Sequence, residues 1–372
     1  MKFSCEKNMI LDALNKVIKT IPPKATMPIL EGILIDLAAD GQLKLTGSDT
    51  ELSVETYIQV ETDQAARFVV HAKTFYDMLG KLDSGTVFFE LDEKQMLHII
   101  NGVIKYDLPT MDATLYPSIP MVEKSKTIVL KEKVLGSMIR QTLFSAAEND
   151  STRSVLKGEY FQIENNEITV VASDTYRLAI RKETFENQNG ENCSFIVPTK
   201  TLSELIKIMK NEDEEVSIGI ASTHIVIEFE QTRITSRLIS GEYLRYQALL
   251  NKTYKTTVKV KCEDLVRAID RASVIITDKI RNVIKVSFEY DSIILYCRTP
   301  EGHSFTDEIP AEKTGENIEM GFKGKYLVEA LNGSEQESVI FDIDSPRSAI
   351  CIRPLEGDSF MYIVSPMKLS ND

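Results

Sequence analysis

The sequence lacks the features that would mark an exported or membrane-bound protein. Residues Met1 to Glu6 hold no apolar run like that of a secretion signal, and no later stretch approaches about 18 uncharged apolar residues. The five cysteines are scattered and never spaced as CxxC, so we expect reduced structural thiols, with neither disulfides nor a zinc site. These absences predict a cytoplasmic protein.

Familiar catalytic motifs are missing as well. The four histidines show neither HExxH nor HxH spacing, and nothing resembles a GxSxG elbow or a phosphate-binding loop. The acidic stretch NEDEEVSIGI at 211–220 is typical of a solvated turn that leads into a strand. We therefore expect no catalytic residues, no metal and no cofactor, with an unrecognised hydrolase as an alternative.

Glycine and proline are few, at 17 and 12 of 372 residues, so little of the chain is expected to be disordered. The length is too great for one ordinary core and fits two to three domains. The net charge of −13 argues at first sight against nucleic acid, which normally needs a basic surface. That objection depends on where the charges lie.

What the sequence does contain is an internal repeat. The passages VHAKTFYDML, VPTKTLSELI and FKGKYLVEAL each place a lysine three residues after an apolar residue and then continue with an apolar stripe. Their lysines, spaced by about 125 residues, are Lys73, Lys200 and Lys325. A strand-like segment follows each passage: FFEL, SIGI and IFDI.

Another amphipathic helix lies upstream of each of these passages. Between the two helices of each repeat lies a hairpin-like run, with a turn at Ser48, Ser173 or Thr299. We therefore predict three copies of one domain, each with two short helices and about eight strands. The expected boundaries are 1–124, 125–250 and 251–372. Helices on one face of antiparallel sheet make this an α+β fold.

Positive charge concentrates on the predicted helices, each of which is net positive, whereas strands and loops carry the negative charge. Lys16 and Lys19 on the first helix, and Arg267 and Arg271 on a later one, are expected to point away from the core. Such side chains could attract DNA phosphates without reading bases. The alternative is a repeat-built scaffold that binds protein partners but no DNA.

From Met1 to Leu369 the sequence resembles the bacterial beta sliding clamp, the processivity subunit of DNA polymerase III. The resemblance lies in the opening MKFSCEKNMILDALNKVIKTIPPKATMPILEGILI, in LTGSDTELSVE and VASDTYRLA, and in the closing YIVSPMKL. It implies a non-catalytic homodimer, joined head to tail into a ring with helices lining a central hole. It also implies loading onto duplex DNA by an ATP-dependent clamp loader.

The resemblance implies roles for particular residues. Those at or near positions that face DNA are Lys24, Lys73, Arg153, Lys200, Lys279 and Arg281. Those near positions of the dimer contact are Phe75, Tyr106, Leu108, Val274 and Ile275. As an alternative, the lysines could serve solubility and the apolar side chains could belong to the core.

The resemblance further implies a hydrophobic groove where polymerase, clamp loader and repair proteins dock a short peptide. Its expected residues are Leu156, Ser173, Thr175, Tyr176, Arg177, Leu178, Leu244, Leu249, Tyr326, Ile363, Val364, Pro366, Met367, Lys368 and Leu369. By itself, YIVSPMKL is typical of an ordinary terminal strand. Tyr176 and Leu244 stand where the family has histidine and proline, and 370–372 extends past the usual end, so the peptide preference is open.

Overall fold

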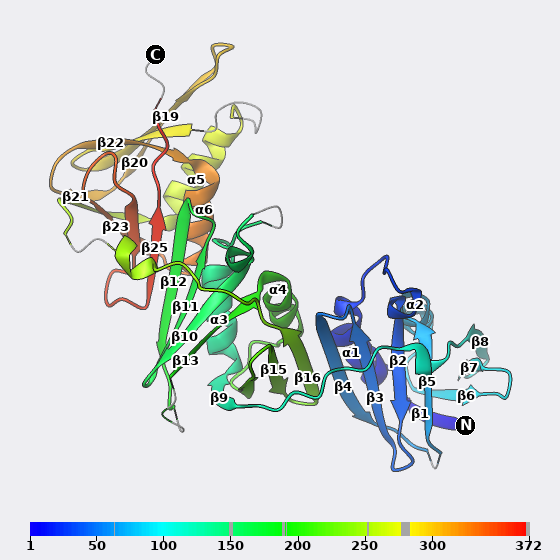
Figure 1. Cartoon of the computed structure of the whole chain (residues 1–372). Coiled ribbons are helices and arrows are strands. Elements are labelled where there is room, and N and C mark those ends of the chain that lie inside the picture. Colours follow the sequence, from blue (N-terminus) through cyan, green and yellow to red (C-terminus); the bar gives the residue numbers. More distant parts are fainter. Residues whose placement is uncertain are drawn as a thin grey trace. The chain divides into compact units, whose positions relative to one another are not determined.

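The computed structural model describes residues 1–62, 64–148, 152–187, 190, 192–250, 253–276 and 283–369. The chain forms two compact units. Unit 1 consists of Met1–Lys133 and Lys200–Leu238, and unit 2 of Val134–Thr199 and Ile239–Asp372. Figure 1 labels most of the helices and strands of both units.

Unit 1 contains two antiparallel sheets. The four-stranded sheet has the order β1 (Lys2–Glu6), β6 (Thr86–Leu91), β7 (Met96–Asn101), β8 (Ile104–Pro109). The eight-stranded sheet has the order β5 (Ala66–His71), β2 (Gly32–Leu37), β3 (Gln42–Ser48), β4 (Leu52–Gln59), β16 (Thr232–Arg237), β15 (His224–Phe229), β14 (Glu215–Ile220), β9 (Lys126–Lys131). β4 pairs with β16, so this sheet joins strands of the first and second repeats.

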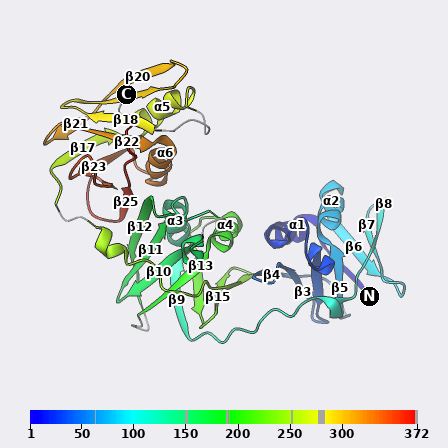
Figure 2. The same ribbon diagram turned by 45° about the horizontal axis from the view of Figure 1, so that its top comes forward.

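Helices α1 (Lys7–Val17) and α2 (Ala72–Lys81) lie side by side in unit 1 (Figure 2). The buried face of α1 follows the helical period predicted from the sequence, with Ile10 and Leu14 fully buried. On α2 the buried Phe75 meets the ring of Phe89 from β6 at 6.2 Å between ring centroids. Aromatic packing of this kind fixes the helix against the four-stranded sheet. All but the first residue of α4 (Thr199–Ile208) also belongs to unit 1.

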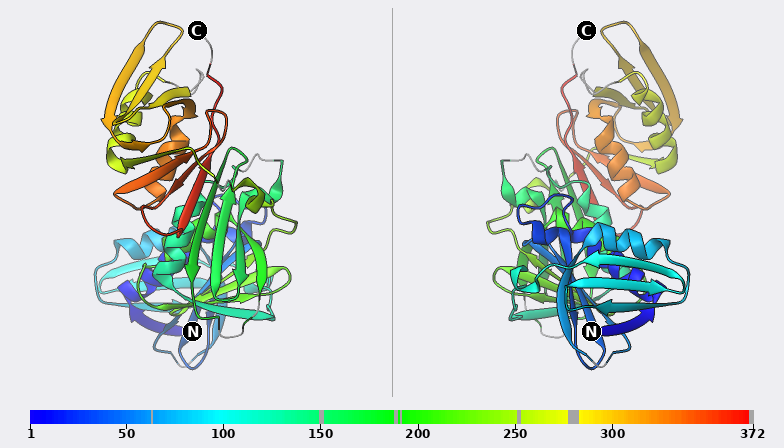
Figure 3. Two further views of the ribbon diagram at one scale, coloured as in Figure 1. Left: turned by 90° about the vertical axis from the view of Figure 1, so that its left-hand side faces the viewer. Right: turned by 90° about the vertical axis from the view of Figure 1, so that its right-hand side faces the viewer.

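Unit 2 likewise contains two antiparallel sheets. The nine-stranded sheet has the order β13 (Cys193–Pro198), β10 (Gly158–Glu164), β11 (Glu167–Ser173), β12 (Arg177–Thr184), β25 (Phe360–Val364), β24 (Ile350–Arg353), β23 (Ser338–Ile343), β17 (Thr256–Lys261), β21 (Glu312–Thr314). The four-stranded sheet has the order β20 (Ser304–Pro310), β19 (Ser292–Arg298), β18 (Val283–Phe288), β22 (Ile318–Lys323). Figure 3 shows the red strand β25 beside the green strand β12, where the second and third repeats meet.

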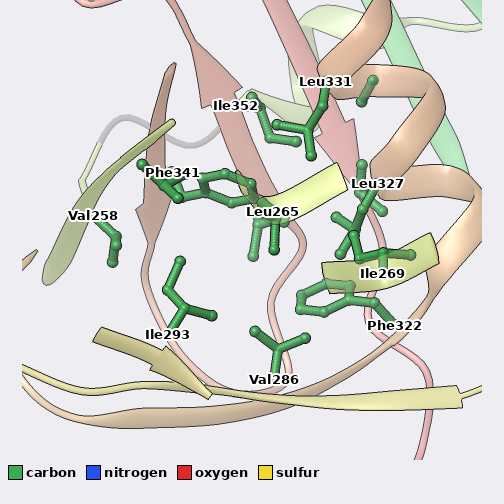
Figure 4. Packing of buried hydrophobic residues seen from close by; sticks show 14 of the residues in the cluster. Val258, Leu265, Ile269, Val286, Ile293, Phe322, Leu327, Leu331, Phe341 and Ile352 are labelled. Atoms are coloured by element: carbon green, nitrogen blue, oxygen red, sulfur yellow. The ribbon is translucent and has the colours of Figure 1, made fainter. Parts of the chain in front are cut away.

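The helices of unit 2 are α5 (Cys262–Ser273), α6 (Gly324–Gly333) and most of α3 (Glu132–Leu143). The core of the third repeat is almost wholly aliphatic and aromatic, with Leu265 and Ile269 of α5 packed against Leu327 and Leu331 of α6 (Figure 4). Phe322 of β22 closes this core and is fully buried. Burial of such surface, at about 25 cal/mol per Å², is the main force that holds each repeat together.

The repeat predicted from the sequence is confirmed in its elements. Lys73, Lys200 and Lys325 are each the second residue of a helix, namely α2, α4 and α6. FFEL, SIGI and IFDI lie in β6, β14 and β23, and the predicted hairpins are β3–β4, β11–β12 and β19–β20. The sequence did not predict that sheets would run from one repeat into the next. Sharing a sheet covers strand edges that would otherwise be open to other chains.

Candidate docking and nucleic-acid surfaces

In two of the three repeated hairpins, the turn between the two strands has the sequence Ser-Asp-Thr. In the β3–β4 turn, Asp49 Oδ1 accepts hydrogen bonds from the N–H groups two and three residues on, and Thr50 has a φ of 79°. In the β11–β12 turn, Asp174 Oδ1 does the same, and Thr175 has a φ of 80°. The aspartate side chain stabilises a backbone conformation that a β-branched residue rarely adopts.

The second of these turns holds Arg177, which is 8% exposed. Its Nε donates to Asp174 Oδ2 at 3.0 Å, and its Nη1 donates to a Glu329 carboxylate oxygen on α6. The resemblance to the clamp family implied that Arg177 lines the peptide groove. The structure shows that two carboxylates already engage this guanidinium, so it fastens β12 to α6.

The guanidinium of Arg177 also lies against two aromatic rings. Its central carbon is 4.5 Å from the ring centroid of Tyr326 and 5.6 Å from that of Phe144. A second cation, Lys323 Nζ, lies 4.9 Å from the Tyr326 centroid. Burial, as the largest influence, raises the pKa of the Tyr326 phenol, so the ring stays neutral and is attractive to both cations.

Many of the predicted groove residues come together in unit 2. Leu156, Leu178, Leu244 and Ile363 pack into one hydrophobic cluster, whereas Val364 and Tyr326 pack against the core of the third repeat. The inner residues, each under 9% exposed, are Leu156, Ser173, Arg177, Leu178, Ile363 and Val364. The half-buried ones are Leu244, Tyr326, Pro366 and Leu369.

The remaining predicted groove residues lie on the surface. The exposed ones are Thr175, Tyr176, Leu249, Met367 and Lys368. Tyr176 and Leu249 are each 56% exposed, and Met367 is 37% exposed. Exposed large apolar side chains above buried aliphatic ones are typical of a surface that binds a peptide.

The segment after β25 is held against this surface by backbone hydrogen bonds. Ser365 N donates to Tyr176 O at 2.9 Å, and Met367 N donates to Gly321 O at 2.8 Å. A Cβ atom at Gly321 would lie 2.7 Å from Met367 O, so a residue other than glycine would push the segment away. The C-terminal extension 370–372 lies outside the described residues.

Four of the six cations expected to face DNA lie in the described part of the chain. Lys24, Lys73, Arg153 and Lys200 are all exposed, and Lys200 forms an ion pair with Asp49. Within the described ranges, Lys24 and Lys73 have no ion-pair partner, so their charges are available to phosphates. Lys279 and Arg281 lie outside the described residues.

Two helix lysines that were expected to point away from the core, Lys16 and Lys19, are bonded to another part of unit 1. Lys16 is only 15% exposed and donates to Glu230 Oε2 at 2.8 Å, and Lys19 Nζ donates to the backbone carbonyl of Lys207. Glu230 also accepts from Lys210 at 2.7 Å, and the hydrogen bonds from Lys16 and then Lys210 lower the pKa of its carboxyl. Helical periodicity places a side chain on a face but does not reveal which neighbour covers that face.

The five residues expected near a dimer contact have different environments. Phe75 and Leu108 are buried within unit 1, where their side chains serve its own packing. Tyr106 on β8 and Ile275 after α5 are half-buried, and Val274 is 80% exposed. Since β8 and β20 each end a four-stranded sheet, each presents one open edge.

Several residues of these surfaces were not singled out from the sequence. Glu329 and Phe144, which contact Arg177, come from two separate helical regions of unit 2, and no short motif connects them. Asp174 could have been found, because the SDT turn recurs at residues 48–50 and 173–175. Its ion pair with Arg177 follows from the two residues being three apart around a tight turn.

Features of a metal centre or a membrane span are absent from the described ranges. In that part of the chain, no group of three or more histidine, cysteine, aspartate or glutamate side chains could hold a metal ion. No helix there is both long enough and apolar enough to cross a membrane.

His98 is placed between two carboxylates, with Nδ1 at 2.5 Å from Asp107 Oδ1 and Nε2 at 3.5 Å from Asp92 Oδ2.

Comparison with known proteins covers nearly the whole chain. Family models of the DNA polymerase III beta subunit match residues 1–120 (N-terminal domain), 129–244 (central domain) and 247–368 (C-terminal domain). The chain is 32% identical to the beta sliding clamp of Staphylococcus epidermidis over 99% of both proteins. It is 29% identical to the beta sliding clamp of Bacillus subtilis, with 99% of this chain and 100% of the relative covered. The crystal structure of the DNA polymerase sliding clamp from Bacillus subtilis superimposes with a TM-score of 0.95, at 29% identity and with 100% of both chains covered.

Proposed function

The chain belongs to the DNA polymerase III beta subunit family, and from this premise we propose that it is a DNA sliding clamp. It encircles duplex DNA and tethers the replicative polymerase, without catalysing a reaction itself. The single observation that carries this proposal is the match of all three domain models along one continuous chain. We place the clamp in the cytoplasm, where replication takes place in bacteria.

The ring is closed by two copies of the chain joined head to tail. Each copy supplies three clamp domains, at 1–124, 125–250 and 251–372. The open strand edges support this closure, because β8 of one copy offers unpaired backbone groups and β20 of another offers the same. Half-buried Tyr106 on β8 and exposed Val274 after α5 supply apolar contact area.

DNA is held by enclosure together with weak attraction to its phosphates. Lys24 and Lys73 are exposed and lack a carboxylate partner in the described part of the chain, which suits a contact that must slide. Lys200, Arg153, Lys279 and Arg281 are proposed to add to the same attraction. Because the net charge of the chain is −13, the positive charge must act locally.

Partner proteins dock a short peptide on the unit 2 surface formed by the predicted groove residues. Leu156, Leu178 and Ile363 supply buried aliphatic anchors, and Met367 supplies a flexible apolar side chain that can adapt to different ligands. Polymerase, clamp loader and repair proteins are therefore expected to compete for one surface.

The decisive experiment is topological. A clamp loader with ATP should place the protein on nicked circular DNA, and cutting that circle should release the protein from the ends. Blocking both ends with bound protein should restore retention. Persistent retention on linear DNA with open ends would refute encirclement. A monomer in light scattering at micromolar concentration would count against closure by two copies.

A further inference from the structure

Lys323 is a lysine for which the described part of the chain supplies no carboxylate partner. It ends β22 and directly precedes α6, and its side chain is half-buried. Arg177, which lies against the same Tyr326 ring, and Lys325, two residues further along the chain, both pair with Glu329. Over the described ranges of the chain, Lys323 forms no ion pair, and its ammonium lies instead 4.9 Å from the Tyr326 ring centroid.

The charged side chains around Tyr326 do not balance, and Lys323 supplies the excess positive charge. Asp174 and Glu329 supply two negative charges, and Arg177 and Lys325 supply two positive ones. These four form a connected network, so its carboxylates are already engaged. Lys323 adds one positive charge that the network does not balance, on a partly desolvated ammonium held by an aromatic face.

This surplus charge lies at the edge of the proposed docking surface. Tyr326 belongs to that surface, and Gly321, two residues before Lys323, bonds to Met367 in the segment after β25. Ser365 in the same segment bonds to the backbone of Tyr176. A peptide seated on the aliphatic anchors would therefore extend past the Lys323 ammonium.

Resting on the peptide docking proposed above, we infer that Lys323 selects partner peptides that carry an acidic side chain next to their apolar anchors. A carboxylate there would complete the ion pair that Lys323 lacks, with Tyr326 holding the ammonium in place. A basic residue at the same place would meet uncompensated like charge. Lys323 is thus a specificity-determining residue, whereas Arg177 positions the surface without contacting the ligand.

The inference is tested with two synthetic peptides, acetyl-Glu-Leu-Ser-Leu-Phe-amide and its glutamine counterpart, acetyl-Gln-Leu-Ser-Leu-Phe-amide. Their affinities for the full-length protein are measured by competition fluorescence anisotropy at low salt. We expect the glutamate peptide to bind about three- to five-fold more tightly, the effect of one partly exposed ion pair. Raising the salt concentration should shrink this preference.

Two variants separate the inference from the docking proposal. Lys323→Gln should abolish the preference, because both peptides then meet a neutral side chain. Lys325→Gln is the matched control. Lys325 is two residues further along the chain and is already paired with Glu329, so this variant should keep the preference. Equal affinity of the wild-type protein for both peptides, or a preference that survives Lys323→Gln, would overturn the role of Lys323 alone. Failure of the wild-type protein to bind either peptide would overturn the docking surface, and this inference with it.

Discussion

Replacing Arg177 by alanine should loosen the contact between β12 and α6. The substitution leaves Asp174 and Glu329 without their shared cation and removes a cation–π contact at 4.5 Å. Breaking a fully buried ion pair costs about 3–5 kcal/mol. The cost here is lower, because the Glu329 side chain is 31% exposed and Asp174 keeps two backbone hydrogen bonds. We expect about 2 kcal/mol of lost local stability.

Native-state hydrogen exchange with mass spectrometry can measure this change, because local opening free energies set exchange rates. A loss of about 2 kcal/mol corresponds to roughly 30-fold faster exchange of amides in β12 and α6. Arg245→Ala is the matched control, since Arg245 is 87% exposed and its pair with Glu242 should contribute little. Peptides from unit 1 should not change. Exchange in β12 and α6 that rises less than two-fold, or no more than in the control, would refute the reasoning.

Three further outcomes are expected. Lys24→Glu should lower retention on circular DNA more than it lowers peptide affinity, and Lys94→Glu, on an exposed turn, should do neither; equal losses in both assays would contradict the assignment. Deleting 367–372 should weaken binding of a polymerase peptide while DNA retention persists, and unchanged peptide affinity would rule out the docking surface as mapped. For His98, the hydrogen bond to Asp107 raises the pKa of the imidazole above its usual 6.5. Its stabilising contribution is therefore complete below pH 6.5 and is lost as pH rises through the raised pKa. An NMR titration of the His98 ring with a midpoint at or below 6.5 would contradict this.

Much of the architecture could be predicted because it follows from local chemistry repeated along the chain. The lysines at 73, 200 and 325 stand at the same helix position in three repeats, so one correct helix assignment supports the other two. Apolar residues at helical spacing marked α1 in the same way, because burial of one face sets that period. The turns at Ser48 and Ser173 were predicted from the same repetition, and the structure shows that each is held by side-chain to backbone hydrogen bonds within four residues.

The pairing of charges could not be predicted from the same patterns. Lys16 looked free on its helix, yet it pairs with Glu230, which is more than 200 residues away in sequence. Arg177 looked available for a ligand, yet Glu329 on α6 already binds it. Such contacts form only when distant elements pack, so no local rule anticipates them.

The sequence by itself determined that this protein is built from three copies of an α+β domain, and its motifs were sufficient to recognise the family. These properties depend on periodicity, turn chemistry and repetition, which are local in the chain. Only the tertiary structure decided that β4 pairs with β16 and β12 with β25, so that neighbouring repeats share continuous sheets. It also decided that Lys323, unlike Arg177, forms no ion pair with any residue that the structure describes. Strand pairing and ion pairing depend on which groups lie close together in the folded chain. The linear order of residues does not specify those distances.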